Sequence, residues 1–185
     1  MRNERVFSSS CYAVGQAQLA QARDRVSKLT ELELSAENES DTLKALYKKF
    51  DIPPAVIEKD GIKVAERERE YFRGKAMLIE FQVPYIGDGK FFILSPSSSN
   101  ILGNVEVRDG YIGFTYPSQQ ESPEQMKGRF ESDLQRFEAT LQLLTAEANQ
   151  FNERLLQALQ TLVDERKAAF GKKNNFLDGL GYSRV

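Results

Sequence analysis

The most regular pattern in the chain is a row of apolar residues in its C-terminal third. Successive members are alternately four and three residues apart. The row consists of Phe130, Leu134, Phe137, Leu141, Leu144, Ala148, Phe151, Leu155, Ala158 and Leu162. A repeat sustained over more than four heptads predicts one long helix with a coiled-coil seam along one side. No Gly or Pro interrupts residues 129–170, which favours an unbroken helix.

The sequence also carries signals for both ends of this helix. Ser122 suits the N-cap, Pro123 the first helical position, and Gln125 the position that completes a capping box. Gly171 is the expected end, because glycine readily adopts the conformation that terminates a helix. A helix between these signals has about 45–50 residues.

Two shorter helices are expected before residue 51. The first lies within residues 12–34 and the second covers residues 43–50, after a cap at Ser40 or Asp41. The apolar positions of the first are Tyr12, Leu19, Ala22, Val26 and Leu29. Both helices can pack against the long one. Any part of the seam that they leave uncovered is a candidate surface for a second copy or for another protein.

The middle of the chain predicts a small antiparallel β-meander. Residues 77–85 alternate between apolar and polar side chains, as a half-buried strand does. A turn at residues 87–89 leads to a second expected strand at residues 90–94. Asp109 and Gly110 then form a favoured two-residue turn between strands at residues 105–108 and 111–115.

Residues 51–74 allow two interpretations, which the sequence does not separate. A turn at Asp60 and Gly61 can join residues 56–57 to residues 62–64 as a hairpin. Alternatively, the same pair can cap a helix through the alternating charges of residues 66–70.

Composition divides the chain into three segments and supports an α+β fold. Residues 1–74 hold 13 basic and 13 acidic residues and are expected to be mainly helical. Residues 75–116 form the meander, with only 7 charges but 7 of the 19 aromatic residues. Residues 117–185 form the long helix and a short tail, with 9 basic and 10 acidic residues. Together the segments predict one composite domain.

Missing residue types narrow the chemistry more than the overall composition does. The chain has no His and one Cys, so histidine-dependent nucleophiles, histidine metal sites and internal disulfides are excluded. No cofactor is expected. A formal charge of −2 makes nucleic-acid binding an unfavoured function. The first ten residues lack an apolar core, and no run approaches the roughly 20 apolar residues of a membrane span, so we expect a cytoplasmic protein.

Two alternatives to a pure interaction role remain. Asp60 and Glu80 could hold Mg²⁺ for hydrolysis of nucleic acid or nucleotides, an arrangement that resembles restriction-endonuclease-like motifs with Gln82 in place of their lysine. Strand alternation also explains Glu80 and Gln82 as solvent-facing residues. A small-ligand or peptide module is the other alternative, with Phe91, Tyr111 or Phe114 lining a pocket on the aromatic sheet face.

The turn at residues 87–89, the Phe91–Phe92 pair and the long helix together resemble uncharacterised bacterial proteins that couple a small β unit to a long C-terminal helix. The resemblance implies a subunit of a bacterial complex, accessory to a defence or toxin-like effector. The expected function is therefore a non-enzymatic interaction subunit. Its expected interaction seam, towards a protein partner or a second copy, is Phe130, Leu134, Phe137, Leu141, Leu144, Phe151, Leu155 and Leu162.

Overall fold

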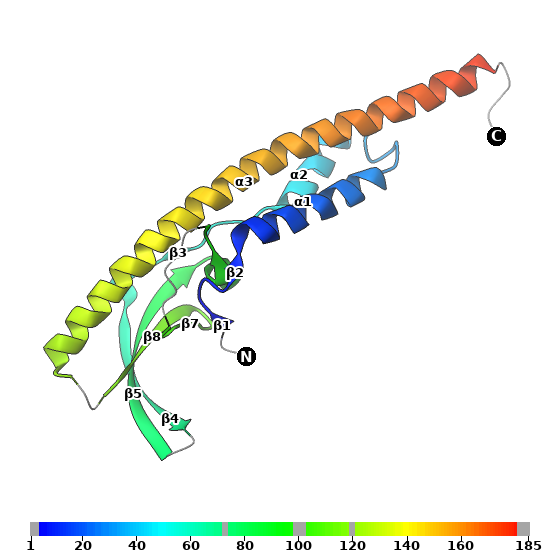
Figure 1. Ribbon diagram of the computed structural model, residues 1–185. Helices are drawn as coiled ribbons and strands as arrows, with labels where there is room; N and C mark the ends of the chain where they lie inside the picture. Colours follow the sequence, from blue (N-terminus) through cyan, green and yellow to red (C-terminus); the bar gives the residue numbers. More distant parts are fainter. Residues whose placement is uncertain (1–3, 72–73, 98–102, 119–120, 181–185) are drawn as a thin grey trace. The chain divides into compact units, whose positions relative to one another are not determined.

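The computed structural model describes residues 4–71, 74–97, 103–118 and 121–180 (Figure 1). An antiparallel sheet and a long C-terminal helix make up an α+β fold, as predicted. The chain forms two compact units, which we describe separately. The sheet unit comprises residues 1–14 and 53–149, and the helical unit comprises residues 15–52 and 150–185. Helix α3 (Pro123–Gly179) contributes residues to both units, so the units do not follow the three compositional segments.

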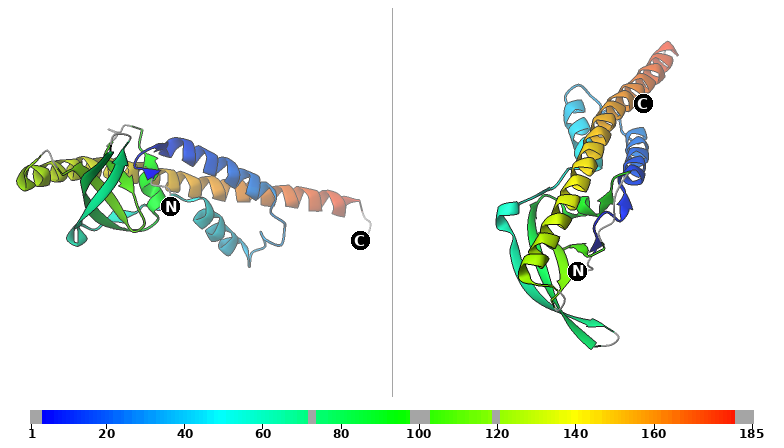
Figure 2. Two further views of the ribbon diagram at one scale, coloured as in Figure 1. Left: turned by 90° about the horizontal axis from the view of Figure 1, so that it is seen from below. Right: turned by 60° about the vertical axis from the view of Figure 1, so that its left-hand side comes forward.

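The main sheet has the strand order β1-β7-β8-β5-β3, and β4 also pairs with β5. Every neighbouring pair in it is antiparallel, and the strands curl rather than lie flat (Figure 2). Its strands are β1 (Glu4–Arg5), β3 (Val56–Ile57), β4 (Lys63–Tyr71), β5 (Gly74–Ile86), β7 (Val105–Val107) and β8 (Tyr111–Pro117). Two short segments, β2 (Ser9–Ser10) and β6 (Leu94–Ser95), form a separate parallel pair.

Aromatic rings join this sheet to the N-terminal part of α3. Phe137 is fully buried, and its ring centroid lies 5.2 Å from that of Phe7 and 5.7 Å from that of Phe114. Phe130, two turns earlier on α3, stacks on Phe81 of β5 at 4.2 Å. Rings at these separations add to the free energy gained from burying their area. The apolar face of the sheet therefore packs against the N-terminal part of the predicted seam.

One hydrogen bond fixes the sheet and helix further. The Tyr116 hydroxyl of β8 donates to the Asp133 carboxylate of α3 at 2.9 Å. Burial raises the pKa of Tyr116, and the hydrogen bond to Asp133 raises it further. The phenol therefore stays protonated and remains a donor.

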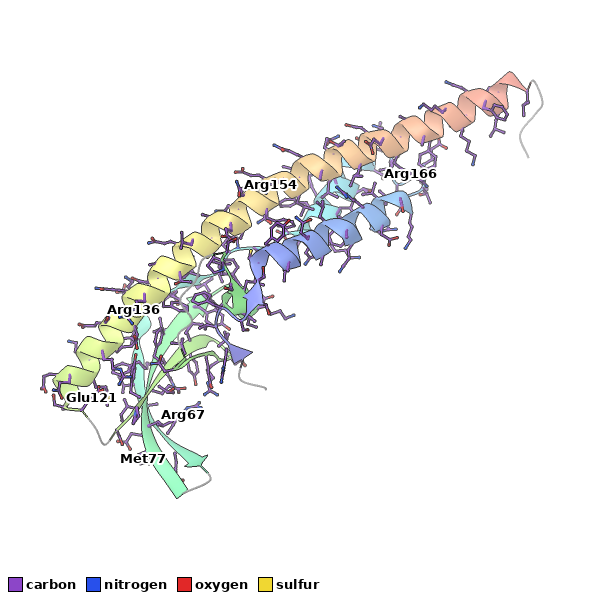
Figure 3. All side chains as sticks on the ribbon, in the orientation of Figure 1. Arg67, Met77, Glu121, Arg136, Arg154 and Arg166 are labelled. Atoms are coloured by element: carbon purple, nitrogen blue, oxygen red, sulfur yellow. The ribbon has the colours of Figure 1, made fainter. Side chains whose placement is uncertain are left out.

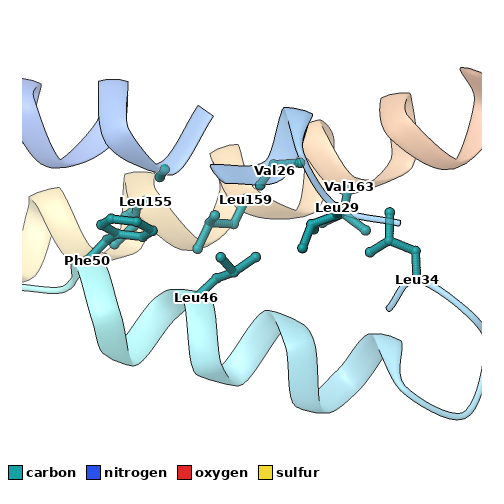
Figure 4. Packing of buried hydrophobic residues seen from close by; sticks show 9 residues of the cluster. Val26, Leu29, Leu34, Leu46, Phe50, Leu155, Leu159 and Val163 are labelled. Carbon is teal, nitrogen blue, oxygen red and sulfur yellow. The ribbon is translucent and has the colours of Figure 1, made fainter. Parts of the chain in front are cut away.

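The helical unit packs α1 (Cys11–Ser27) and α2 (Glu39–Phe50) against the C-terminal part of α3 (Figure 4). Arg166 of α3, labelled in Figure 3, donates two hydrogen bonds to the Leu29 carbonyl at 3.2 and 3.1 Å. The buried apolar cluster of the helical unit consists of Ala22, Val26, Leu29, Leu34, Leu46, Phe50, Leu155, Leu159 and Val163. Each element contributes apolar side chains to the cluster, so the fold of the unit rests on all of them.

A polar contact lies inside this helical core. The Asn152 amide of α3 is only 8% exposed, and it accepts from the Ile52 N–H at 2.8 Å while donating to the Ile52 carbonyl at 2.9 Å. The side chain thus pairs with both backbone groups of one residue, as a neighbouring strand would. Buried backbone groups need hydrogen-bond partners, and Asn152 supplies them for Ile52, just after the end of α2.

The start of α3 agrees with prediction, whereas its end and its seam do not fully agree. Ser122 and Gln125 exchange the two hydrogen bonds of a capping box, at 2.9 and 3.3 Å. The helix passes through Gly171 to Gly179, and residues 181–185 of the expected tail lie outside the described residues. A glycine costs an exposed helix only about 1 kcal/mol, so it does not by itself end one.

The seam shifts by one residue in the helical unit. Asn152, Leu159 and Val163 are buried there, whereas Phe151, Ala158 and Leu162 are only half-buried. A straight helix turns every 3.6 residues, so a strict 3.5-residue repeat drifts by about 20° per heptad. The buried stripe follows the helix geometry instead of the heptad.

Both interpretations of residues 51–74 are wrong. Residues 56–57 pair with residues 85–86, whereas residues 66–70 lie in β4 and pair with β5. Asp60 and Gly61 belong to a single 3₁₀ turn, η1 (Lys59–Gly61). Alternating opposite charges suit a strand with two polar faces as well as they suit a helix. The backbone of the long strand β5 provides hydrogen-bond partners for residues 63–71, so these residues form a strand.

Other local predictions also need correction. Residues 90–94 were expected as a strand, but η2 (Gly89–Ile93) is a 3₁₀ helix capped by Asp88, which accepts from the Lys90 N–H at 2.9 Å. Phe91 and Phe92 are both buried, which a half-buried strand does not allow for neighbours. The first helix ends at Ser27, with Tyr12 exposed on its surface, and α2 begins after Asn38 rather than at Ser40 or Asp41.

A pair of neighbouring leucines tests whether the stripe is internal core. Leu144 is fully buried, whereas Leu143 is 49% exposed. We expect Leu144→Ala to lower the free energy of unfolding by about 2–5 kcal/mol, because it leaves a cavity. Leu143→Ala should change it by less than about 1 kcal/mol. Urea denaturation of both variants measures the difference, and equal small losses would contradict a core role.

The Asn152 contact makes a second prediction. Asn152→Ala leaves the buried Ile52 N–H and carbonyl without partners, so we expect a loss of about 2–4 kcal/mol. The exposed Asn149→Ala serves as the control and should lose less than about 0.5 kcal/mol. Hydrogen exchange should show the Ile52 amide protected in the wild type and exchanging faster in Asn152→Ala. An unchanged exchange rate would rule out the contact.

Candidate interaction surface

The predicted interaction seam is mostly buried by the chain itself. Six of its eight residues are at most 8% exposed, and Phe151 and Leu162 are half-buried. The first five belong to the sheet unit, and the remainder belong to the helical unit. A residue that fills its own core cannot also contact a partner while the protein stays folded. Any binding surface must therefore be sought elsewhere.

Glu80 is the centre of a buried ionic cluster on the polar face of the sheet. Its side chain is fully buried, and its Oε2 atom lies 2.7 Å from Nε of Arg67, which is labelled in Figure 3. Gln82 and Tyr111 donate to the same oxygen at 3.0 and 3.3 Å. The other oxygen, Oε1, lies 3.6 Å from Nε of Arg108. Alternation predicted a solvent-facing Glu80, and that prediction is wrong because these side chains cover it.

The cluster is closed and electrically balanced. Glu106 pairs with Arg108 at 2.7 Å, so two carboxylates face two guanidinium groups. Gly113 of β8 leaves room for the Glu80 carboxylate, since a Cβ there would lie 2.7 Å from its Oε1 atom. Within the described residues, the Glu80 Oε1 and Arg108 Nε atoms have no hydrogen-bond partner, and their 3.6 Å separation makes only an ion pair. The charges of this cluster are thus used within the protein.

The proposed metal pair is not assembled. Asp60 lies exposed in η1 and is not among the partners of Glu80 given above. Among the residues that the structure describes, no group of three or more His, Cys, Asp or Glu side chains could hold a metal ion. Both Glu80 oxygens face cationic side chains, which compete with a metal for the same lone pairs. This geometry gives no support to the metal-dependent hydrolase.

The aromatic sheet face does not form the expected ligand pocket either. Phe91 and Phe114 are buried in the packed core of the sheet unit. Tyr111 belongs to the opposite, polar face, where its hydroxyl accepts from Arg67 at 3.1 Å and donates to Glu80. The residues predicted to line one pocket therefore lie on two sides of the sheet.

A groove in the sheet unit runs between β3 and α3 and has a volume of about 550 Å³. Its lining combines aliphatic side chains, including Val56, Ile57 and Leu141, with polar ones such as Gln142, Thr145 and Asn149. The ion pair between Lys59 and Glu138, at 2.5 Å, joins two of its lining residues. Polar side chains and this ion pair lie among its apolar side chains.

A second groove, in the helical unit, lies between α2 and α3 and has a volume of about 560 Å³. We call it the α2–α3 groove. Leu43 and Tyr47, one turn apart on α2, line it together with Leu156 of α3, which is 53% exposed. Ala36, Glu39, Ser40 and Lys44 complete the lining. Two leucines and a tyrosine on one open surface make an apolar patch of the kind that binds proteins.

Leu156 is not part of the predicted seam, although the sequence carries a signal for its exposure. Leu155 and Leu156 are neighbours, and a helix that buries the first turns the second about 100° away from the core. A leucine pair in a helix with one buried stripe therefore places one member outside the stripe. Leu143 and Leu144 repeat the pattern in the sheet unit.

Comparisons with protein families, with curated proteins and with solved structures found no match to this chain. The resemblance to bacterial β-and-helix proteins consequently stays a prediction. No helix within the described residues is both long enough and apolar enough to cross a membrane.

The ionic cluster predicts a clear effect of one substitution. Glu80→Ala removes the buried carboxylate that faces Arg67 and Arg108. Because Arg67 is 39% exposed and Arg108 keeps Glu106 as an ion-pair partner, we expect a loss of about 1–3 kcal/mol in the free energy of unfolding. The exposed Glu66→Ala, on the neighbouring strand β4, should lose less than about 0.5 kcal/mol. Thermal and urea unfolding of both variants test this. An unchanged stability of Glu80→Ala would contradict the structural role and would favour a functional carboxylate again.

Proposed function

We propose that the protein is a non-enzymatic interaction subunit of a larger complex, and that its α2–α3 groove binds an amphipathic helix of a different protein. This proposal keeps the function expected from the sequence but moves the binding surface from the buried seam to the open groove. The observation that carries it is Leu156, a half-exposed leucine at a groove that also offers Leu43 and Tyr47.

The shape of the groove favours a helix as the bound element. Its walls are two helices, α2 and α3, and the side chains of neighbouring helices form ridges and grooves into which a third helix can pack. Binding in such grooves uses apolar anchors spaced three or four residues apart. Burying Leu156 fully would contribute about 1 kcal/mol, since half of its surface is already covered.

Charged side chains at the groove favour binding of a specific partner over non-specific hydrophobic association. Glu39 pairs with Lys167 at 2.6 Å, and Lys44 pairs with Asp41 at 3.4 Å. Both pairs are partly or largely solvent-exposed, so they form a polar rim around the apolar centre. A rim of this type selects partners by charge and raises the rate of encounter.

Affinity purification with quantitative mass spectrometry tests the proposal, using wild-type protein and two leucine variants. We expect Leu156→Glu to lose the bound partner, because a charge would be buried in the apolar centre. Leu143→Glu places the same charge on an exposed leucine of the same helix, outside the groove, and should retain it. With the purified partner, the Kd should rise at least about tenfold for Leu156→Glu alone.

Three outcomes would contradict the proposal. A partner retained equally by wild type and Leu156→Glu would place the binding surface elsewhere. Recovery of only a second copy of this chain would replace a heteromeric complex with a homo-oligomer. If no protein binds Leu143→Glu and fails to bind Leu156→Glu, the support for an interaction role at this groove is removed.

A further inference from the structure

Two large apolar side chains are exposed in the last turns of α3, within the helical unit. Phe176 is 69% exposed, and Leu180, which follows the last residue of the helix, is 52% exposed. The Leu180 N–H donates to the Leu177 carbonyl at 3.2 Å, so the helical turn continues to this residue. Residues four apart lie on the same side of a helix, so the two side chains share one face. In Figures 1 and 2 this part of α3 continues past α1 and α2, so neither helix covers it.

The contacts of neighbouring residues explain why this face is exposed to solvent. Asn174 donates to the Glu31 carboxylate at 2.7 Å, and Phe170 packs against the buried apolar cluster, so their side of α3 faces the rest of the helical unit. Each residue turns a helix by about 100°, which places Phe176 about 200° from Asn174 and therefore on the opposite side. The exposure of Phe176 thus follows from the side of α3 that the unit uses for packing.

Two lysines whose charges are not used within the protein flank this apolar pair. Lys172 and Lys173 are exposed, and neither forms an ion pair or hydrogen bond with another residue that the structure describes. Around the helix axis they lie about 40° to one side of Phe176 and about 60° to the other. The only acidic residue in positions 168–180 is Asp178, which lies about 200° from Phe176, on the far side of the helix. The exposed face is therefore both apolar and locally basic.

We propose that the face of α3 formed by Lys172, Lys173, Phe176 and Leu180, which we call the Phe176 face, binds the surface of an anionic lipid bilayer. Phe176 and Leu180 enter the boundary between the headgroups and the acyl chains. The two lysines keep their stems beside the apolar side chains and place their ammonium groups among the lipid phosphates. This is a surface contact and requires no membrane-spanning helix. Phe176 lies about 30 Å along α3 from Leu156, so the proposal is independent of the α2–α3 groove.

The combination of charge and apolar area favours a lipid surface as the occupant. Cations on both sides of an apolar pair are typical of helices that lie in a membrane interface. Nucleic acid would attract the lysines but would give the apolar pair no place to leave water. The formal charge of −2 does not oppose the contact, because salt screens charges more than about 8–10 Å away. Clusters that bind anionic lipids by charge alone hold about 4–8 cations, so two lysines bind weakly and need the apolar pair.

Fluorescence of the full chain carrying Phe176→Trp tests this, because the natural sequence contains no Trp. The variant is titrated with vesicles of phosphatidylcholine containing about 30% phosphatidylserine, and with vesicles of phosphatidylcholine alone. We expect the emission to shift to shorter wavelength as the indole leaves water, and binding to be at least about tenfold tighter to the anionic vesicles. Adding Lys172→Gln and Lys173→Gln should weaken that binding about 30-fold, since each lysine near an anionic surface contributes about fivefold.

An adjacent lysine pair of α2 supplies the control. Lys48 and Lys49 are also exposed, and replacing both by Gln in the Phe176→Trp chain makes the same change in net charge. This double variant should bind the anionic vesicles within about twofold of its parent, because its charges lie away from the Phe176 face. In cosedimentation, Phe176→Glu should abolish binding of the otherwise unchanged chain, and Leu143→Glu, at an exposed leucine of the sheet unit, should retain it.

Several outcomes would overturn the proposal. These are equal binding to both kinds of vesicle, no wavelength shift with either, and equal losses from the two lysine pairs. If the wild type binds no vesicles but binds a protein that Phe176→Glu fails to bind, the face belongs to a protein interface, and the proposal is also overturned. Circular dichroism shows whether each variant is folded. If the double variant at Lys172 and Lys173 does not fold, Lys172→Gln alone should still weaken binding about fivefold.

Discussion

The fold depends on one apolar stripe along α3. In the sheet unit the stripe places Phe137 and Leu144 in the core, and in the helical unit it places Leu155 and Leu159 there. Burying a side chain of this size contributes about 1.5–3 kcal/mol, so the stripe is a large part of the core of both units. Because folding uses this surface, any partner must bind to another one. The open groove beside Leu156 is one surface that folding leaves available.

The sequence predicted the features that depend on local chemistry. The four-and-three spacing and the Ser122 capping box identified α3 correctly, because helix periodicity and capping act within a few residues. The register of the seam after Ala148 was wrong, because a heptad drifts on a straight helix. Residues 66–70 could not be assigned, since their charges satisfy strand and helix equally. Their structure is decided by β5, and such pairing is not visible in a short window of sequence.

Glu80 illustrates why the candidate site was only partly predictable. Alternation correctly placed it on the polar face of its strand, but that face was assumed to be in contact with water. Arg67 and Arg108 come from different strands and close over the carboxylate, which no spacing in the sequence reveals. The acidic and basic side chains of the cluster bind one another, so the cluster stabilises the sheet unit.

The central claim is that the α3 stripe is internal core rather than an interface. Sedimentation and urea denaturation over a hundredfold range of protein concentration test this most directly. We predict a mass of 21.0 kDa at every concentration and an unfolding midpoint that does not change with concentration. A mass of twice that value, with a midpoint that rises as the protein is concentrated, would show that the stripe is completed by a second copy and would contradict the account.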